Sequence, residues 1–270
     1  MVVRTRLVLT SGLMFRLRET PRPAGSVVPT MVLVHGIGMS HRYLSRLHER
    51  LAEHTRVVSV DLPGFGGLPK PSVDVGVERM GSALAEVIGT LGDDRVVLVG
   101  HSMGAQWTVE AALHRPEYVR AVVAIGPVVD ERWRTIPAQA RALAIDTVGE
   151  TPAINTIVFT DYLRCGVRWY LRQARHMIGY RLQERVAELT LPLLVIRGGA
   201  DPIAGRAWCR RLRDSARVSR LVEIPGHHHV AQQSAPRAVA SAILAHTAGA
   251  WPHAATSRSM DEKRSAPSTS

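Results

Sequence analysis

The sequence predicts an α/β fold, in which a mostly parallel, doubly wound sheet carries an inserted helical cap. Short, continuous apolar runs alternate with longer stretches whose apolar residues recur three and four positions apart. These are the patterns of buried strands and of amphipathic helices. One long helical stretch interrupts the alternation. A chain of 270 residues, 46% of them apolar, can bury one large core, so we expect one such domain.

The predicted strands begin with an antiparallel edge. Residues 2–19, VVRTRLVLTSGLMFRLRE, read as two strands that meet at a Ser-Gly turn. After this edge come apolar runs of the kind that a parallel sheet buries on both faces. A last strand pattern ends the series. The runs lie at residues 30–36, 56–61, 94–102, 119–126 and 191–199, the last strand pattern at 217–226, and helix-compatible stretches at 41–54, 77–92 and 103–118.

The interruption predicts a helical cap over residues 130–188, inserted between two parts of the core, 1–129 and 189–248. Strand signals give way there to helical ones. Thr151 and Pro152 suit an N-cap and a first helical position, and Gly149 suits the end of the preceding helix. Residues 249–270 are rich in Ser, Ala, Pro and charge, which predicts a disordered tail.

Composition limits the partners and the compartment. The net charge of +11 is spread along the chain and accompanies no helix-turn-helix, zinc-finger or RNP pattern, so we expect no nucleic-acid partner. No run of 18 apolar residues predicts a membrane span, and the first residues do not resemble a secretory signal. The only cysteines, Cys165 and Cys209, argue against a disulfide framework. We therefore expect a cytoplasmic protein in which either cysteine could be a buried thiol.

The stretch from Gly100 to Gly104, GHSMG, has the context of a nucleophile elbow. It directly follows a buried-strand pattern and opens a helix pattern. The glycines stand two residues on each side of Ser102 because the strained turn leaves no room for a Cβ atom there. We therefore predict that Ser102 is a nucleophile. The alternative is that Ser102 is an ordinary helix N-cap.

A serine nucleophile needs a base and an orienting acid, in the order Ser, Asp or Glu, His in this architecture. Asp201 follows a predicted strand in GGADPI, and three histidines, 227–229, follow the next. All three groups would lie at the carboxyl edge of one sheet. Asp130 also follows a strand and is a rival acid, in which case Asp201 only shapes the turn before Pro202.

The remaining motif of the predicted site is HGIG, residues 35–38, which ends the strand pattern at 30–36. Its backbone at Ile37 can donate one N–H group of an oxyanion hole, and Met103 the other. His35 is expected to hydrogen-bond its own loop. The three consecutive histidines do not favour a metal site, because successive Cβ atoms of an extended chain point apart.

Together these motifs resemble the α/β-hydrolase fold superfamily, in the branch of capped serine esterases, C–C hydrolases and haloperoxidase-like proteins. The resemblance covers roughly residues 30–245 and rests on HGIG, DLPGFGG (61–67), GHSMG, GGADPI and IPGHHH. Ser102 disfavours the branch with an aspartate nucleophile. Family members usually read I-P-G-x-G-H, with a proline seven residues after the histidine. The resemblance therefore implies that His229 is the base, since Pro236 lies seven residues later, whereas His228 stands where glycine is common.

The function expected from these residues is hydrolysis of a small or medium carboxylic ester through an acyl-enzyme, without metal or cofactor. Ser102, Asp201 and His229 would form the triad. Alternatives are a C–C bond hydrolase, a lactonase or a thioesterase with the same triad, and a non-catalytic ligand-binding member of the fold.

The cap holds two sets of residues with open roles. One set recurs at helical spacing and would stripe one helix face, either as a solvated face or as an entrance that attracts anionic substrates. The other set could line an apolar acyl pocket or pack between helices. The first set is Arg164, Arg168, Arg172 and Arg175, and the second is Phe159, Tyr162, Trp169 and Tyr170.

Overall fold

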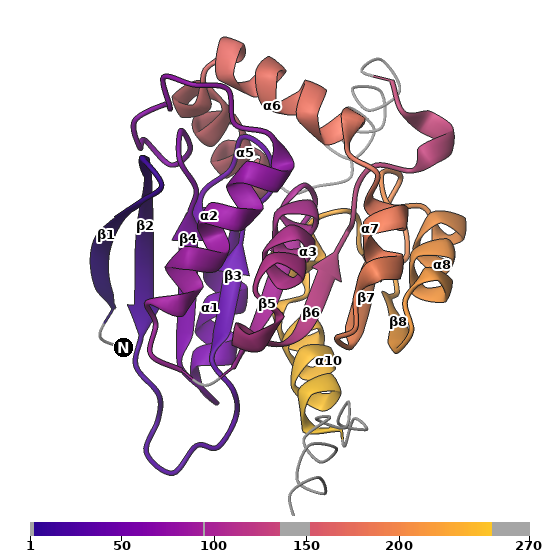
Figure 1. The fold of residues 1–270 in the computed structure, drawn as a ribbon. Coiled ribbons are helices and arrows are strands. Elements are labelled where there is room, and N and C mark those ends of the chain that lie inside the picture. Colours follow the sequence, from indigo (N-terminus) through magenta and orange to yellow (C-terminus); the bar gives the residue numbers. More distant parts are fainter. Residues whose placement is uncertain (1–2, 94, 136–151, 250–270) are drawn as a thin grey trace, which may run out of the picture.

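The computed structural model describes residues 3–93, 95–135 and 152–249, which build an eight-stranded sheet in the order β1-β2-β4-β3-β5-β6-β7-β8 (Figure 1). β2 is antiparallel to both its neighbours, β1 and β4, and the other neighbouring pairs are parallel. This confirms the predicted α/β fold with a mostly parallel, doubly wound sheet and an antiparallel edge. The strands are Arg4–Thr10 (β1), Leu13–Thr20 (β2), Met31–Val34 (β3), Val57–Asp61 (β4), Val96–His101 (β5), Val119–Ile125 (β6), Leu193–Gly198 (β7) and Ser219–Ile224 (β8).

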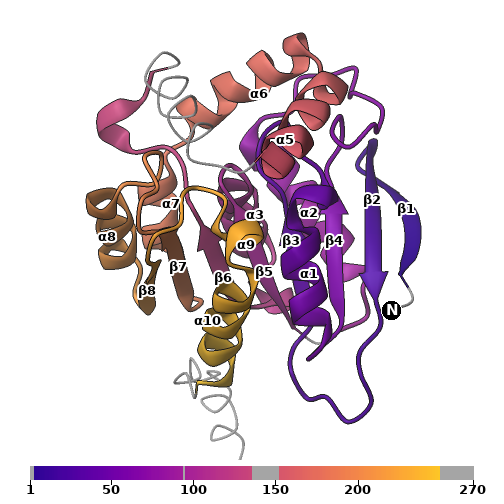
Figure 2. The same ribbon diagram turned by 180° about the vertical axis from the view of Figure 1, so that it is seen from behind.

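Helices cover both faces of the sheet. α2, α3, α7 and α8 lie over one face, and α1, α9 and α10 lie over the other (Figures 1 and 2). The alternation of strand side chains supplies both cores: Val96 and Leu98 pack on the first side, and Val97 and Val99 on the second. The helices are Ser45–Ala52 (α1), Val77–Gly89 (α2), Gly104–His114 (α3), Pro152–Cys165 (α5), Val167–Gly179 (α6), Leu182–Glu188 (α7), Arg206–Ser215 (α8), Ala231–Ser234 (α9) and Pro236–Ala248 (α10).

The segment between β6 and β7 holds α5, α6 and α7. α5 and α6 lie across the carboxyl ends of the parallel strands (Figure 1). α7 instead contacts α3 and α8 on the flank of the sheet. Pro152 is the first residue of α5, as the sequence predicts. The helix predicted to end at Gly149, the caps Gly149 and Thr151, and residues 250–270 of the predicted tail lie outside the described residues.

The predicted arginine stripe on one helix face is wrong. α5 ends at Cys165 and α6 begins at Val167, because Gly166 between them has a φ of +74°, which no helix continues. Arg164 therefore belongs to α5, and the other three arginines belong to α6. All four side chains are exposed.

Two findings bear on the expected compartment. Within the described ranges, no helix combines the length and the apolar character that a membrane span requires. Cys165 and Cys209 are both buried and free, and burial raises the pKa of each thiol to about 12. Thiols with so high a pKa are inert. The cytoplasmic location stays a prediction.

His48 makes the stability of this fold depend on pH. It lies buried on α1, between the hydroxyls of Thr20 and Ser59, at 2.8 and 2.7 Å. Burial, reinforced by the charge of Arg18, lowers the pKa of His48 from 6.5 to about 4. The unfolded chain therefore binds a proton that the folded protein excludes, so stability is full above pH 6.5 and declines as the pH falls toward 4.

We expect this histidine to remove about 2 kcal/mol of unfolding free energy between about pH 7 and about pH 5. Urea unfolding at the two values measures the loss. His48→Gln should reduce the pH dependence by that amount, and His54→Gln, which removes an exposed histidine just beyond the same helix, is the matched control. An unchanged pH dependence in His48→Gln would contradict the assignment.

Candidate active site

The sharp turn at Ser102 is built by close contacts of the backbone. β5 ends at His101, α3 begins at Gly104, and Ser102 between them has a φ of +56°. A Cβ atom on Gly100 would overlap the carbonyl of Gly104, and one on Gly104 would lie 2.5 Å from the carbonyl oxygen of Val34. A non-glycine residue at positive φ is strained and persists only where its surroundings hold it. The geometry is therefore that of the predicted elbow.

The HGIG loop lies directly beside Ser102. A Cβ atom on Gly36 would stand 3.0 Å from the Cβ atom of Ser102. The N–H groups of Ile37 and Met103 donate no hydrogen bond to any residue in the described ranges. Met103 directly follows Ser102 and Ile37 directly follows Gly36, so both predicted donors lie close to the serine along the chain and in space.

His35 joins the HGIG loop to the DLPGFGG loop. The N–H group of Leu62 donates to Nε2 of His35 over 3.1 Å, so Nδ1 carries the proton and donates to the carbonyl of Gly36 over 2.8 Å. Burial lowers the pKa of His35, which keeps this neutral form. The expected bond of His35 to its own loop is present, and a second bond connects the ends of β3 and β4.

Asp201 and His229 form a buried pair. Nδ1 of His229 donates to Oδ2 of Asp201 over 2.9 Å, and the N–H groups of Ile203 and Ala204 donate to Oδ1. Burial alone would raise the pKa of Asp201, but the nearby His229 and the two N–H groups outweigh it and hold the pKa below its usual value. The carboxylate therefore stays ionised at neutral pH and fixes the proton of His229 on Nδ1, which leaves Nε2 as the basic nitrogen.

The rival acid and the neighbouring histidines have other partners. Asp130 accepts hydrogen bonds from the backbone of Arg132 and from the guanidinium of Arg211, the latter over 2.5 Å. Nδ1 of His227 lies 2.9 Å from the hydroxyl of Ser234. Of the two candidate acids, Asp201 is the one that contacts His229, and His227 and His229 have different partners.

Two further residues hold His229 in place. The ring of His101 packs against it with centroids 4.8 Å apart, and Nε2 of His101 donates to its carbonyl over 3.1 Å. Burial, reinforced by the adjacent His229, lowers the pKa of His101 to about 3, so this support is neutral. On the other side is Gly126, at the end of β6, where a Cβ atom would lie 2.9 Å from Nδ1 and Cε1 of His229.

A buried arginine supports the loop that carries Asp201. The guanidinium of Arg197, on β7, donates to the carbonyls of Gly199, Asp201 and Ala204 and forms an ion pair with Glu223 at 2.5 Å. Three backbone carbonyls and a carboxylate thereby satisfy a cation that would otherwise be costly to bury. The loop conformation that presents Asp201 follows from these bonds.

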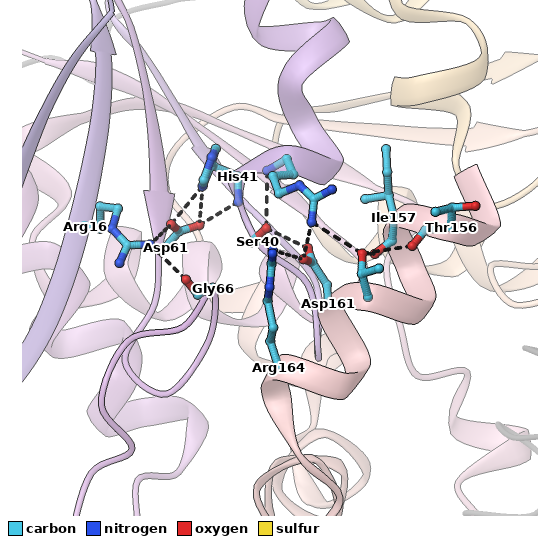
Figure 3. Close-up of polar contacts among 11 residues, drawn as sticks. Arg16, Ser40, His41, Asp61, Gly66, Thr156, Ile157, Asp161 and Arg164 are labelled. Carbon is cyan, nitrogen blue, oxygen red and sulfur yellow. Dashed lines mark hydrogen bonds and ion pairs between the residues drawn. The ribbon is translucent and has the colours of Figure 1, made fainter. Parts of the chain in front are cut away.

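α5 is bonded to the segment that follows HGIG. The buried carboxylate of Asp161, on α5, accepts a hydrogen bond from the hydroxyl of Ser40 over 2.6 Å and pairs with Arg42 and Arg164 (Figure 3). The carboxylate of Asp61, buried nearby, holds His41 and Arg16 (Figure 3). Asp161, on α5, fixes Ser40, and Asp61, at the end of β4, fixes His41. Ser40 and His41 are consecutive residues of one loop.

The aromatic side chains of α5 and α6 divide into an inner and an outer set. Tyr162 and Tyr170 contact each other and cover Gly38 of the HGIG loop. Trp169 packs on Phe65 and on Gly64 of the DLPGFGG loop. Phe159 instead is exposed to solvent. Tyr162, Tyr170 and Trp169 therefore face the loops beside Ser102, whereas Phe159 does not.

The comparison with known proteins identifies the family. The Alpha/beta hydrolase family matches residues 31–242. The chain belongs to the alpha/beta hydrolase family. The match covers every motif of the candidate site, from His35 to His229.

Several proteins are similar to this alpha/beta hydrolase. An uncharacterized protein of Mycobacterium tuberculosis is 30% identical over 135 residues, which are 47% of this chain and 39% of that protein, so the chain spans well under half the length of this relative. The 2-(acetamidomethylene)succinate hydrolase of Mesorhizobium japonicum is 27% identical, with 80% of this chain and 86% of that protein covered. The enol-lactonase structure from Burkholderia xenovorans has a TM-score of 0.75 at 20% identity, with 89% and 99% coverage, and shows the shared fold.

Gly126 provides a test of the geometry around His229. Gly126→Ala should push the imidazole away from Asp201, because the new methyl group has no other space. The proton resonance of the Asp201–His229 hydrogen bond, at low field in NMR spectra, should therefore be lost. Gly25→Ala is the matched control, since Gly25 also has a positive φ but open space around it, so both variants carry the strain of about 1–2 kcal/mol. A resonance retained in Gly126→Ala would contradict the close contact.

Proposed function

We propose that this alpha/beta hydrolase cleaves a small or medium carboxylic ester through an acyl-enzyme on Ser102. The observation that carries the proposal is the buried hydrogen bond between Asp201 and His229 at the same sheet edge as a serine held at positive φ. The glycine contacts beside Ser102 support it further. A serine needed only as an N-cap would require neither the strain nor the buried acid and base.

In the proposed mechanism, Nε2 of His229 takes the proton of Ser102 as its Oγ attacks the ester carbonyl. Asp201 keeps the imidazole in the required tautomer and stabilises the imidazolium that forms. The N–H groups of Ile37 and Met103 stabilise the oxyanion of the tetrahedral intermediate. The leaving alcohol receives the proton from His229, and the acyl group stays on Ser102.

Deacylation repeats these steps with water. His229 deprotonates a water molecule that attacks the acyl carbonyl, the same N–H groups hold the oxyanion, and the carboxylic acid leaves as Ser102 recovers its proton. None of these steps needs a metal or a cofactor. We propose that Tyr162 and Tyr170, which cover Gly38, line the acyl side of the site.

A lactone is the second candidate substrate. A lactone is a cyclic ester, so the same triad opens it by the same steps, and the similar Burkholderia structure is an enol-lactonase. The similar Mesorhizobium protein is a hydrolase of a substituted succinate, which favours small acidic substrates in this branch. Cleavage of a C–C or thioester bond by the same triad remains an alternative, as does a non-catalytic member of the fold.

The nucleophile is tested by Ser102→Ala. The variant should lose nitrophenyl ester hydrolysis and labelling by a fluorophosphonate, because both need Oγ, while its thermal unfolding midpoint stays close to that of the wild type. A series of esters of increasing chain length then defines the acyl group. A variant that keeps near-normal hydrolysis would exclude Ser102 as the nucleophile, and a wild-type protein that neither reacts with the probe nor cleaves any ester would favour the non-catalytic alternative.

The acid is tested by comparing two asparagine variants. Asp201→Asn should lower kcat by about 10³ to 10⁴, because an amide favours the wrong tautomer of His229. Asp130→Asn, the matched control, should leave kcat nearly unchanged, since Asp130 pairs with Arg211 instead. Steady-state kinetics on one nitrophenyl ester measures both, and the reverse order of effects would transfer the acid role to Asp130.

A further inference from the structure

The outer face of α5 and α6 carries a row of exposed apolar side chains. Phe159, Leu163, Val167 and Leu171 are 63%, 67%, 73% and 44% exposed. They recur every four residues in the sequence, two on α5 and two on α6, on either side of Gly166. Scattered apolar residues are normal on a protein surface, but four large ones on two consecutive helices are typical of a surface that another body covers.

Arginines accompany this row. Arg164, Arg168 and Arg172 each directly follow one of its apolar residues, and Arg175 lies one turn beyond. The only acidic residue in the sequences of α5 and α6 is Asp161, which is buried beneath them. Arg168 and Arg175 form no ion pair with any residue that the structure describes. Arg164 pairs with Asp161 and Arg172 with Asp74, so Arg168 and Arg175 supply the cationic charge of this apolar face.

The position of this face leaves it accessible. α6 is the outermost helix beyond the carboxyl ends of the strands, at the end of the molecule opposite to the end of α10 (Figures 1 and 2). The inner faces of α5 and α6 are occupied, since Ile154, Trp169 and Met177 are buried against the rest of the fold. The outer row consequently has no partner within the described part of the chain.

We propose that the outer face of α5 and α6 docks on an anionic phospholipid membrane. Apolar side chains of a surface helix enter the boundary between head groups and acyl chains, and flanking arginines pair with lipid phosphates. The charge argues against a second copy of the chain on this face, because a two-fold contact would bring two sets of arginines together. Docking would orient the strand ends that carry Ser102 toward the lipid, although binding itself requires no turnover.

Sedimentation with vesicles tests the proposal on the full chain. The protein should bind vesicles of phosphatidylcholine and phosphatidylglycerol, bind them less as salt is added, and leave vesicles of phosphatidylcholine alone largely unbound. Arg168→Gln with Arg175→Gln should weaken binding by about thirtyfold, about fivefold for each charge removed near the surface. Leu163→Ser with Val167→Ser should weaken it by at least about tenfold through lost insertion.

Two double variants serve as matched controls. Leu7→Ser with Leu9→Ser removes equally exposed leucines from the edge strand β1, and Arg79→Gln with Arg210→Gln removes two exposed arginines from α2 and α8. Both should bind the anionic vesicles like the wild type. Thermal unfolding midpoints close to that of the wild type would show that all four double variants fold.

Three outcomes would overturn the proposal: no binding to anionic vesicles, equal losses in the cap variants and their controls, or a dimer in light scattering that Leu163→Ser with Val167→Ser dissociates. The proposed esterase can fail separately. Vesicle binding by Ser102→Ala reports docking alone, and hydrolysis of a water-soluble ester reports the triad alone.

Discussion

The close approach of backbone segments at the carboxyl edge of the sheet is the constraint on which the rest of this structure depends. α3 begins so near β3 that Gly104 leaves no space for a Cβ atom before the carbonyl of Val34, and Gly100 is blocked by Gly104 itself. A turn this tight forces Ser102 to positive φ. The side chain that emerges from it has little conformational freedom, which is the condition for holding a nucleophile at a fixed distance from a base.

Buried charge then fixes the loops around this turn. Asp201, Asp61 and Asp161 are all buried, and each accepts several hydrogen bonds from a loop at the strand ends. A buried carboxylate that lost these donors would be destabilising by several kcal/mol, so each loop has one strongly favoured arrangement. Arg197 applies the same principle with the opposite charge beneath Asp201. The polar groups therefore specify loop geometry at an edge where the apolar cores do not reach.

The sequence predicts the strands, most helices, the elbow and the pairing of Asp201 with His229, because these depend on local patterns and on the order of motifs along the chain. It does not predict His101 beside His229, Gly126 behind it, Arg197 under the acid or Asp161 above Ser40. His101, Gly126 and Asp161 act through contacts with distant parts of the chain, whereas Arg197 acts through the loop that follows it. A single histidine, glycine, arginine or aspartate has no local pattern that names its partner. The broken arginine stripe has a local cause: Gly166 lies within a continuous helical pattern, and its positive φ turns one expected helix face into two.

The inner face of α5 and α6 is packed on the rest of the fold, whereas the outer face is exposed. The inner face therefore bears on the site, and the outer face bears on what the protein can bind. On the inner face, Tyr162, Tyr170 and Trp169 pack on glycines of the two loops that border Ser102, and Asp161 bonds to the hydroxyl of Ser40. Movement of these helices would therefore change the oxyanion loop as well as the space above the serine. On the outer face, Leu163, Val167, Arg168 and Arg175 form none of these contacts. Their exposure has a cost in water that the fold does not recover, and that cost is removed only where a surface of matching charge and polarity covers them.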